Sequence, residues 1–329
     1  MKVLVIANFK HYQKYMPVND FTKQVEIVFL PRDYQNEELL KVARDAAMIC
    51  IDPISHLDKD VIDKMDNLKI VQSDGVGFNR IDLEACRRKG IYVCNCKGAN
   101  AASVAEQTIL LMLALLRNVI VGNKTVLAGH QIDLKEQMMV EGIVELGDCK
   151  VGLIGFGDIG KATAKRLIPF DCQVVYYDLF KASEALEQEL HVTYEELDNI
   201  AKTCDIISIH CPVTAATTNL INEEFLKKMK PSAYLVNTAR GEIIDNSALA
   251  KALINNQIKG AALDTIAPEP VTKDHILLNL PIERQDKLIF SPHIGGVTSS
   301  FFKRAQAIMW HNLFLVANSK RPLYIVNKL

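Results

Sequence analysis

The sequence predicts an α/β protein with two domains, each organised around a parallel sheet, and three observations lead to this prediction. Short apolar runs alternate with helical patterns from one end of the chain to the other, which is typical of parallel sheets with helices on both faces. The same rhythm restarts after Gly147. The 329 residues, 49% of them hydrophobic, are enough to build two separate cores.

The first half of the chain contains five predicted strands. They are separated by stretches with apolar residues three and four positions apart, such as 36–44 and 81–89, which predict helices. A longer helix is predicted from Asn100, a candidate N-cap, and nothing in the sequence interrupts it before Gly122. The predicted strands are Val3 to Ile6, Val25 to Phe29, Ala47 to Ile51, Ile70-Val71 and Tyr92-Val93.

The second half contains six predicted strands, the number of a complete doubly wound domain. An amphipathic segment with helical spacing, 301–314, follows them, and we expect it to pack back on the first domain. After that segment only 324–326 could form another strand. The six predicted strands are Val151 to Ile154, Val174 to Tyr177, Ile206 to Ile209, Leu235-Val236, Ala261 to Leu263 and Leu288 to Phe290.

The charge balance excludes several classes of partner. The 38 Lys and Arg residues nearly equal the 39 Asp and Glu residues, so there is no basic field for nucleic acid or for an anionic membrane. The longest apolar run, 108–116, is much shorter than the roughly 20 residues of a membrane-spanning helix. The composition therefore predicts a protein that acts on small molecules.

The N-terminus and the cysteines predict a cytoplasmic location. The opening MKVLVIANFKHY lacks the cleavage site of a signal peptide and predicts a first strand instead. The eight cysteines form no C-x-x-C pair, and only Cys94 and Cys96 lie close together in the sequence. We therefore expect reduced thiols and no metal site.

A glycine-rich motif opens the second half. Gly155, Gly157 and Gly160 form a G-x-G-x-x-G directly after a predicted strand and directly before a helical pattern. In this context the first glycine permits a tight turn, the second lets a pyrophosphate approach the backbone, and the third lets the helix pack on the strand. The motif predicts a Rossmann domain that binds a dinucleotide.

Asp178 ends the next predicted strand, about 20 residues after the glycines, where an acidic side chain accepts hydrogen bonds from the adenosine ribose. Its carboxylate would repel a 2′-phosphate, so NAD is favoured over NADP. Lys181 lies near enough in the sequence to leave the strictness of this preference open. The alternative is that Asp178 only terminates a strand.

Further ionisable side chains follow later strands of the second half, namely Arg240, Asp264, Glu269 and His293. Ligands of open parallel sheets bind beyond the carboxyl ends of the strands, so these groups could converge on one crevice beside the glycine loop. Taken singly, each has an ordinary structural alternative, such as a surface ion pair for Arg240 or a capping role for His293.

Six motifs follow one another in the order GFGDIG, Asp178, HCPVTAATTNLI, VNTARGEIID, AALDTIAPEP and SPHIGG. In order and spacing they resemble the D-isomer-specific 2-hydroxyacid dehydrogenase family, which includes glycerate and 3-phosphoglycerate dehydrogenases. The resemblance covers nearly the whole chain, because 73–82 and 95–118 also look like that family's substrate-domain loop and interdomain helix. It implies a flavodoxin-like substrate domain of residues 1–100 plus 297–329, and an NAD-binding Rossmann domain of residues 101–296 with six or more strands.

The resemblance implies NAD-dependent reduction of a 2-keto acid to the (R)-2-hydroxy acid. Hydride transfer builds negative charge on the carbonyl oxygen, and His293 is expected to supply the proton. An ionised Glu269 bonded to His293 would favour the imidazolium and fix the ring. Arg240 would hold the substrate carboxylate and carbonyl oxygen with its forked donors, a geometry that lysine cannot reproduce.

The resemblance also implies binding residues and a homodimer, with 100–145 as the expected interface. The backbone N–H groups of Val76 and Gly77 should bind the substrate carboxylate together with Arg240. Cofactor contacts are implied for Val76, Gly155, Gly157, Asp158, Ile159, Gly160, Asp178, Cys211, Thr238, Asp264 and Gly295.

Several positions depart from the family pattern and leave the identity of the 2-keto acid open. Asn79-Arg80 follow the substrate-loop glycine, and Asp74 places a negative charge where an anionic substrate should dock. Thr265-Ile266 and the lack of a Trp before the nucleotide domain alter the rim of the cleft, whereas Glu269 in place of Gln argues against the formate dehydrogenase branch. A second hypothesis is a non-catalytic NAD(H)-sensing scaffold, like the transcriptional corepressors that share this fold.

Overall fold

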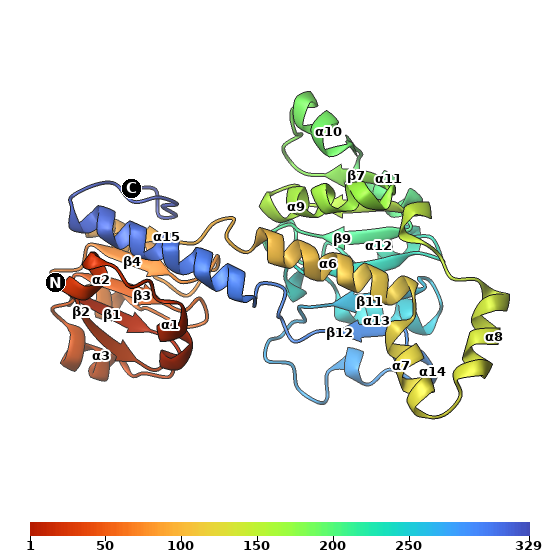
Figure 1. Cartoon of the computed structure of the whole chain (residues 1–329), viewed down its shortest axis with the longest axis horizontal. Helices are drawn as coiled ribbons and strands as arrows, with labels where there is room; N and C mark the ends of the chain where they lie inside the picture. The colour runs from red at the N-terminus through yellow and green to blue at the C-terminus, as the bar shows by residue number, and fades with distance from the viewer. The chain divides into compact units, whose positions relative to one another are not determined.

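A computed structural model describes residues 1–329, which form two compact units (Figure 1). The terminal unit consists of Met1–Asn100 and Val297–Leu329, and the central unit consists of Ala101–Gly296. Each unit has its own parallel sheet and its own apolar clusters. The predicted α/β class is therefore confirmed.

The terminal unit is built on a five-stranded sheet with the order β2-β1-β3-β4-β5, in which every neighbouring pair is parallel. This order is the flavodoxin-like one. All five strands predicted for this part of the chain are present. Their bounds are β1 Lys2–Ile6, β2 Glu26–Leu30, β3 Met48–Ile51, β4 Ile70–Ser73 and β5 Tyr92–Cys94.

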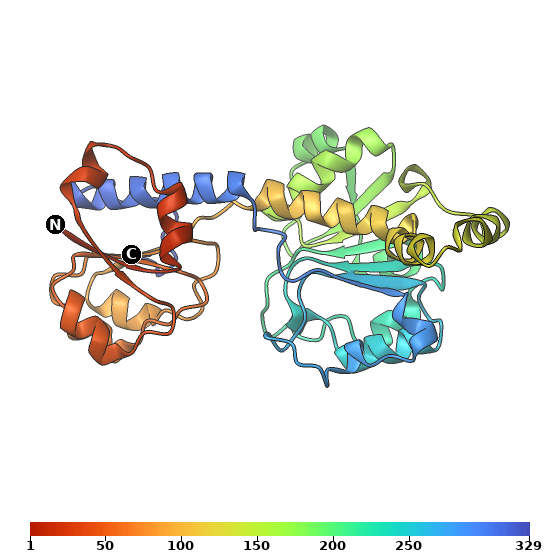
Figure 2. The ribbon, with the colours of Figure 1, turned by 60° about the horizontal axis from the view of Figure 1, so that its bottom comes forward.

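Helices cover both faces of this sheet (Figure 2). Because side chains alternate along a strand, β1 sends Val3 and Val5 to one apolar cluster and Leu4 and Ile6 to the other. The long helix α15 packs on the Val3 side of this sheet. The helices are α1 Phe9–Tyr15, α2 Asp20–Gln24, α3 Asn36–Ala43, α4 Lys59–Ile62, α5 Leu83–Arg88 and α15 Ser299–Ala317.

The segment 324–326 does not form a strand. It makes a single antiparallel bridge, between Ile325 and Cys94 at the end of β5, and the Val326 N–H donates to the Val93 carbonyl oxygen over 2.8 Å. This C-terminal segment is thus hydrogen-bonded to the edge strand β5 and does not add a strand to the sheet.

The central unit is built on a seven-stranded parallel sheet with the order β12-β11-β10-β9-β6-β7-β8. Numbered within this unit, the first six strands follow the doubly wound order 3-2-1-4-5-6, and β12 adds a seventh at one edge. The prediction of six strands missed β8, which has only three residues. The bounds are β6 Lys150–Ile154, β7 Gln173–Tyr177, β8 Val192–Tyr194, β9 Ile206–Ile209, β10 Tyr234–Asn237, β11 Gly260–Leu263 and β12 Leu288–Phe290.

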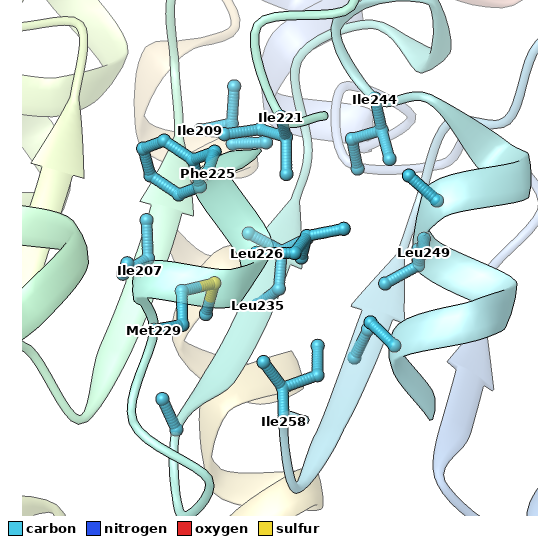
Figure 3. Packing of buried hydrophobic residues seen from close by; sticks show 14 of the residues in the cluster. Ile207, Ile209, Ile221, Phe225, Leu226, Met229, Leu235, Ile244, Leu249 and Ile258 are labelled. Carbon is cyan, nitrogen blue, oxygen red and sulfur yellow. The ribbon is translucent and has the colours of Figure 1, made fainter. Parts of the chain in front are cut away.

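Two apolar clusters lie on the two faces of this sheet. One of them packs α12 and α13 against β9 and β10 through residues such as Leu226, Leu249 and Leu235 (Figure 3). The other packs α6 and α9 against the opposite face. The helices are α6 Ala101–Leu116, α7 Val119–Leu127, α8 Gln131–Glu141, α9 Asp158–Leu167, α10 Glu184–Leu190, α11 Leu197–Thr203, α12 Glu223–Lys228, α13 Asn246–Ile254 and α14 Ile282–Gln285, and single 3-10 turns are η1 Leu146–Asp148, η2 Ile168–Phe170, η3 Gly241–Ile243 and η4 Ile276–Leu278.

The predicted helix from residue 101 ends earlier than expected. Helix α6 stops at Leu116, and α7 starts at Val119 with its axis bent by 58°. Asn118 adopts a left-handed conformation with φ of 50°, which asparagine tolerates better than most residues, and this breaks the helix before Gly122. No single helix has both the length and the apolar character needed to cross a bilayer, and α6 with α7 meets those criteria only as a bent pair.

Candidate active site

The glycine loop has the backbone that the motif predicts. Gly155 has a φ of +99°, and a Cβ there would lie 2.5 Å from the Cys211 nitrogen, so no other residue fits. A Cβ on Gly160 would lie 2.3 Å from the Gly155 oxygen. Around Gly157, by contrast, a Cβ would meet nothing within 4 Å, so this stretch of backbone is open to a ligand.

Helix α9 begins directly after this loop. Gly157 is its N-cap residue, and no side chain caps the helix. The first N–H groups of a helix have no intrahelical acceptor and lie at the positive end of its dipole. The residues present here, including Asp158 and Ile159, therefore fit the pyrophosphate of a dinucleotide.

Asp178 lies just beyond β7 and holds the glycine loop. One of its carboxylate oxygens accepts a hydrogen bond of 2.6 Å from the Phe156 N–H, and the other accepts one of 3.1 Å from the Phe180 N–H. The Gly155 N–H also donates to the Tyr177 carbonyl oxygen, over 2.8 Å. Asp178 therefore lies next to the glycine loop, as its spacing from the glycines predicts.

His293 and Glu269 lie in contact. His293 Nδ1 is 2.8 Å from one carboxylate oxygen of Glu269 and 3.1 Å from the other. Because an ionised carboxylate only accepts, Nδ1 carries the proton. His293 Nε2 has no partner within the chain, and both side chains are a little under half exposed, at 45% and 44%. The imidazole is therefore fixed on one side and open on the other.

The loop that carries Glu269 is clamped at its base. The Ala267 carbonyl oxygen accepts hydrogen bonds from Asn246 Nδ2, over 2.6 Å, and from His275 Nε2, over 3.1 Å. His275 Nδ1 accepts from the Leu277 N–H, which leaves the proton on Nε2. A Cβ on Gly241 would lie 2.2 Å from the Ala267 nitrogen, so this loop packs directly against the residue after Arg240.

Asp264 organises the loop that carries His293. Its carboxylate accepts hydrogen bonds from the Ile294 N–H at 3.0 Å, the Gly295 N–H at 2.8 Å and the Ser291 hydroxyl at 2.5 Å. Its backbone oxygen accepts from the His293 N–H at 2.9 Å. His293 itself has a left-handed backbone with φ of 54°, so these bonds hold a conformation that is unusual for histidine.

Arg240 lies on the surface at the end of β10. Its Nη1 donates to the Ala239 carbonyl oxygen over 2.7 Å, and it pairs with no carboxylate of the chain. The Asn237 side chain fixes this turn, because its Nδ2 donates to the Arg240 carbonyl oxygen and its Oδ1 accepts from the Ala239 N–H. The alternative of a surface ion pair for Arg240 is therefore wrong within this chain.

Two further predicted cofactor contacts lie at neighbouring strand ends. Thr238 is buried, and because Thr108 donates to the Val104 carbonyl oxygen, the Thr238 hydroxyl is the donor in its 2.8 Å bond to Thr108. Cys211 packs its backbone against Gly155. Burial, followed by the Asp178 charge, raises the pKa of the Cys211 thiol to about 11, so this thiol is neutral.

The predicted substrate loop, 73–82, belongs to the terminal unit. Its carbonyl groups are held from within: Gly75 accepts from the Cys96 N–H at 2.8 Å, Val76 from Asn95 Nδ2 at 2.8 Å and Gly77 from the Ser73 hydroxyl at 2.7 Å. The N–H groups of Val76 and Gly77 donate to no group of the chain. Three fixed carbonyls and two free donors make this loop suited to bind an anion.

The structure thus brings most of the predicted residues of the central unit together around the glycine loop and the ends of β10 to β12. Sequence reasoning missed the side chains that hold these residues, above all Asn95, Ser73, Asn246 and His275. Their partners lie far along the chain or on backbone atoms, so no spacing pattern indicated them. No group of three or more His, Cys, Asp or Glu side chains is arranged to hold a metal ion.

Known proteins are similar to this chain in sequence and architecture. The family model described as D-isomer specific 2-hydroxyacid dehydrogenase, NAD binding domain, matches residues 109–295. The chain is 38% identical over 293 residues to a glyoxylate reductase of Thermofilum pendens, which covers 89% of this chain and 84% of that protein. It is 35% identical over 286 residues to a hydroxypyruvate reductase of Thermotoga maritima, with 85% and 88% covered.

A solved structure is similar over the whole chain. It is a D-isomer specific 2-hydroxyacid dehydrogenase of Lactobacillus delbrueckii ssp. bulgaricus in its NAD complexed form, with a TM-score of 0.81 and 26% identity. The similarity covers 99% of this chain and 100% of that one. The fold, the glycine loop and these relatives define an NAD-dependent oxidoreductase.

The chain belongs to the D-isomer specific 2-hydroxyacid dehydrogenase family. The resemblance drawn from the motifs, the enzyme class and NAD as the cofactor are thereby confirmed.

Proposed function

We propose that the protein reduces a 2-keto acid to the (R)-2-hydroxy acid in a reversible reaction, with His293 as the acid and base. The observation that carries this proposal is the 2.8 Å contact between His293 Nδ1 and Glu269, which leaves Nε2 free. Bound NADH supplies the hydride that the substrate carbon receives. His293 Nε2 gives a proton to the carbonyl oxygen, and the Glu269 carboxylate stabilises the imidazolium that holds this proton.

Val76 and Gly77 are proposed to bind the substrate carboxylate. Their two N–H groups have no acceptor in the chain, and the hydrogen bonds to the Gly75, Val76 and Gly77 carbonyls keep those oxygens turned into the protein. An anion that accepts from preorganised N–H groups needs no reorganisation of the loop.

Arg240 is proposed to hold the substrate carboxylate and carbonyl oxygen. Its guanidinium is exposed and engages only one backbone oxygen, so most of its five donors are available. A planar, permanently charged fork can bind two oxygens at once, which a lysine cannot do.

For the cofactor we propose the contacts implied by the family pattern. Gly155, Gly157 and Gly160 would hold the pyrophosphate with the N–H groups of Asp158 and Ile159, and Asp178 would accept from the ribose. The open space at Gly157 and the uncapped start of α9 support this assignment. The remaining proposed contacts are Val76, Cys211, Thr238, Asp264 and Gly295.

We further propose a homodimer that uses α7 and α8, in a protein that works in the cytoplasm. Neither helix buries a single residue in this chain, although both carry large apolar side chains. All eight cysteines are free, which suits a reducing compartment. The exposed large apolar side chains of α7 and α8 are Val119, Ile120, Val126, Leu127, Ile132, Met139 and Val140.

The experiment that tests the proposed reaction follows the loss of NADH absorbance with a panel of 2-keto acids, including glyoxylate, pyruvate and hydroxypyruvate. His293→Ala should lower kcat by about 10²–10⁴-fold. Arg240→Lys should mainly raise KM, and NADH binding, followed by its fluorescence, should persist in both variants. If no acid is reduced while NADH binds tightly, or if His293→Ala retains full activity, the proposed reaction is wrong.

A further inference from the structure

A group of buried polar atoms in the terminal unit has no partner. Ser55 is 3% exposed and its hydroxyl lacks a hydrogen bond, as does the buried Nε2 of His11. The Tyr12 hydroxyl is 0% exposed and has the Cys50 thiol and the Trp310 side chain near it. Tyr12 and His11 lie on α1, just after β1, and Ser55 lies just after β3. Buried polar groups in folded proteins are nearly always satisfied, so several orphans at one end of one sheet point to a ligand.

Asp74 is partly buried and lies near Tyr12. It follows β4 directly and precedes Val76 by two residues, yet its carboxyl forms no hydrogen bond or ion pair with the chain. Burial raises the pKa of the Asp74 carboxyl to about 8, the nearby Asp52 carboxylate adds to the rise, and Arg32 opposes it. At neutral pH this carboxyl is therefore mostly protonated and can both donate and accept.

The charged neighbours of Asp74 cancel each other. Arg32 forms an ion pair with Asp52, whose side chain is buried, so no cation is left for a further anion. Burial raises the pKa of Tyr12 well above its usual value and that of the Cys50 thiol to about 12, so neither group ionises near neutrality. Burial likewise raises the pKa of the Cys96 thiol and lowers that of His11.

We propose that Asp74 and Tyr12 form a specificity subsite that binds a hydroxyl group on the substituent of the 2-keto acid. This inference rests on the proposed function, since Asp74 adjoins the loop that would bind the substrate carboxylate. Both side chains can donate and accept, and a hydroxyl group complements them in both respects. A methyl group would leave them unpaired, and a phosphate group would meet Asp52 and Asp74 without a free cation.

The position of Asp74 in the sequence suggested a negative charge next to an anionic substrate. The raised pKa of Asp74 removes this conflict. A protonated carboxyl adds no repulsion to the carboxylate that Val76 and Gly77 would bind. The specificity of this subsite thus depends on hydrogen bonds and not on charge.

The test compares kcat/KM for hydroxypyruvate, pyruvate and 3-fluoropyruvate at pH 7. Hydroxypyruvate should be favoured over both, because fluorine withdraws electrons as a hydroxyl does but cannot donate. Asp74→Leu should reduce the ratio of kcat/KM for hydroxypyruvate to kcat/KM for pyruvate by about tenfold. Asp74→Asn should keep most of this ratio. Asp60→Leu, which makes the same change at an exposed site of α4, should leave the ratio as in the wild type.

The pH dependence of this ratio gives a second readout. As pH rises through about 8, Asp74 loses the proton that it donates, so the wild-type ratio should fall. The ratio in Asp74→Asn should stay level, because effects of pH on the chemical step that the two substrates share cancel in the ratio. An unchanged ratio in Asp74→Leu, with pyruvate still reduced, overturns the subsite alone, whereas failure to reduce any 2-keto acid overturns the proposed function as well.

Discussion

His293 Nδ1 and the Glu269 carboxylate approach to 2.8 Å, although the two residues are 24 positions apart in the sequence. The contact depends on two separate loops, one tied to Asp264 and the other to Asn246 and His275. The pair is therefore a product of the fold around it, and its chemistry can be altered without removing the imidazole.

Glu269→Gln tests the charge in this pair. The amide has the same shape but no negative charge, so the imidazolium loses its stabilising partner. We expect kcat to fall by about 10²-fold. Steady-state kinetics across pH, with Glu283→Gln on α14 as a surface control, measure this, and a kcat like that of the wild type would contradict the assigned role.

Asn95→Asp tests whether the fixed carbonyls matter for substrate binding. An ionised aspartate would face the Val76 carbonyl oxygen that Asn95 now donates to over 2.8 Å, so the loop should shift. We expect KM for the 2-keto acid to rise by about tenfold at neutral pH. At acid pH, where the aspartate is protonated and can donate again, KM should approach the wild-type value.

The control for that variant is Asn79→Asp, which adds the same charge to an exposed asparagine of the neighbouring segment. It should change KM much less. Equal effects of the two substitutions would mean that charge near the loop, and not the bond to Val76, determines binding.

Asp264→Asn tests the support of the His293 loop. The carboxylate accepts from two N–H groups and a hydroxyl, and an amide nitrogen would place a donor against one of these donors. We expect the free energy of unfolding to fall by about 1–3 kcal/mol and kcat to fall with it. Chemical denaturation and kinetics on the same preparation check both, and an unchanged stability would show that the loop is held by other contacts.

His210→Gln tests a partly buried histidine at the end of β9. Burial lowers the pKa of His210 to about 3, while the unfolded chain has the ordinary value of about 6.5. At a pH below about 6.5 the unfolded state binds a proton that the folded state does not. As pH is lowered further, the free energy of unfolding therefore falls by up to about 1.4 kcal/mol per pH unit.

The glutamine cannot take up this proton and can still bond to Ser208, which now lies 2.9 Å from His210 Nε2. The variant should therefore lose stability less steeply than the wild type between about pH 6 and pH 3. Urea denaturation at several pH values measures the two slopes. Parallel slopes would mean that His210 is protonated in the folded protein.

Periodicity and motif context predicted most of the fold. Buried parallel strands appear as apolar runs, so eleven of the twelve strands were recognised, and the glycine spacing located the cofactor loop. The missed strand, Val192–Tyr194, is too short to show a period. The early end of α6 at Leu116 depends on the backbone of Asn118, which helix propensity alone does not determine.

The contacts that organise the site could not be predicted. Asn95 meets Val76 across neighbouring parallel strands, and Asp264 meets Gly295 through a loop whose path depends on packing. The raised pKa of Asp74 follows from burial and from the Asp52 carboxylate, which lies at the end of another strand. Such effects need the three-dimensional distances, because charge and desolvation act through space and not along the chain.

The return of helix α15 to the first sheet has a consequence for synthesis. Met309, Trp310 and Leu313 complete the apolar cluster on the Val3 and Val5 face of that sheet. A ribosome makes these strands first and α15 last, so this face lacks the α15 side chains until the whole central unit has been translated. During that interval the nascent chain exposes apolar surface that favours aggregation, and a stop codon anywhere in the central unit would leave this face permanently without α15.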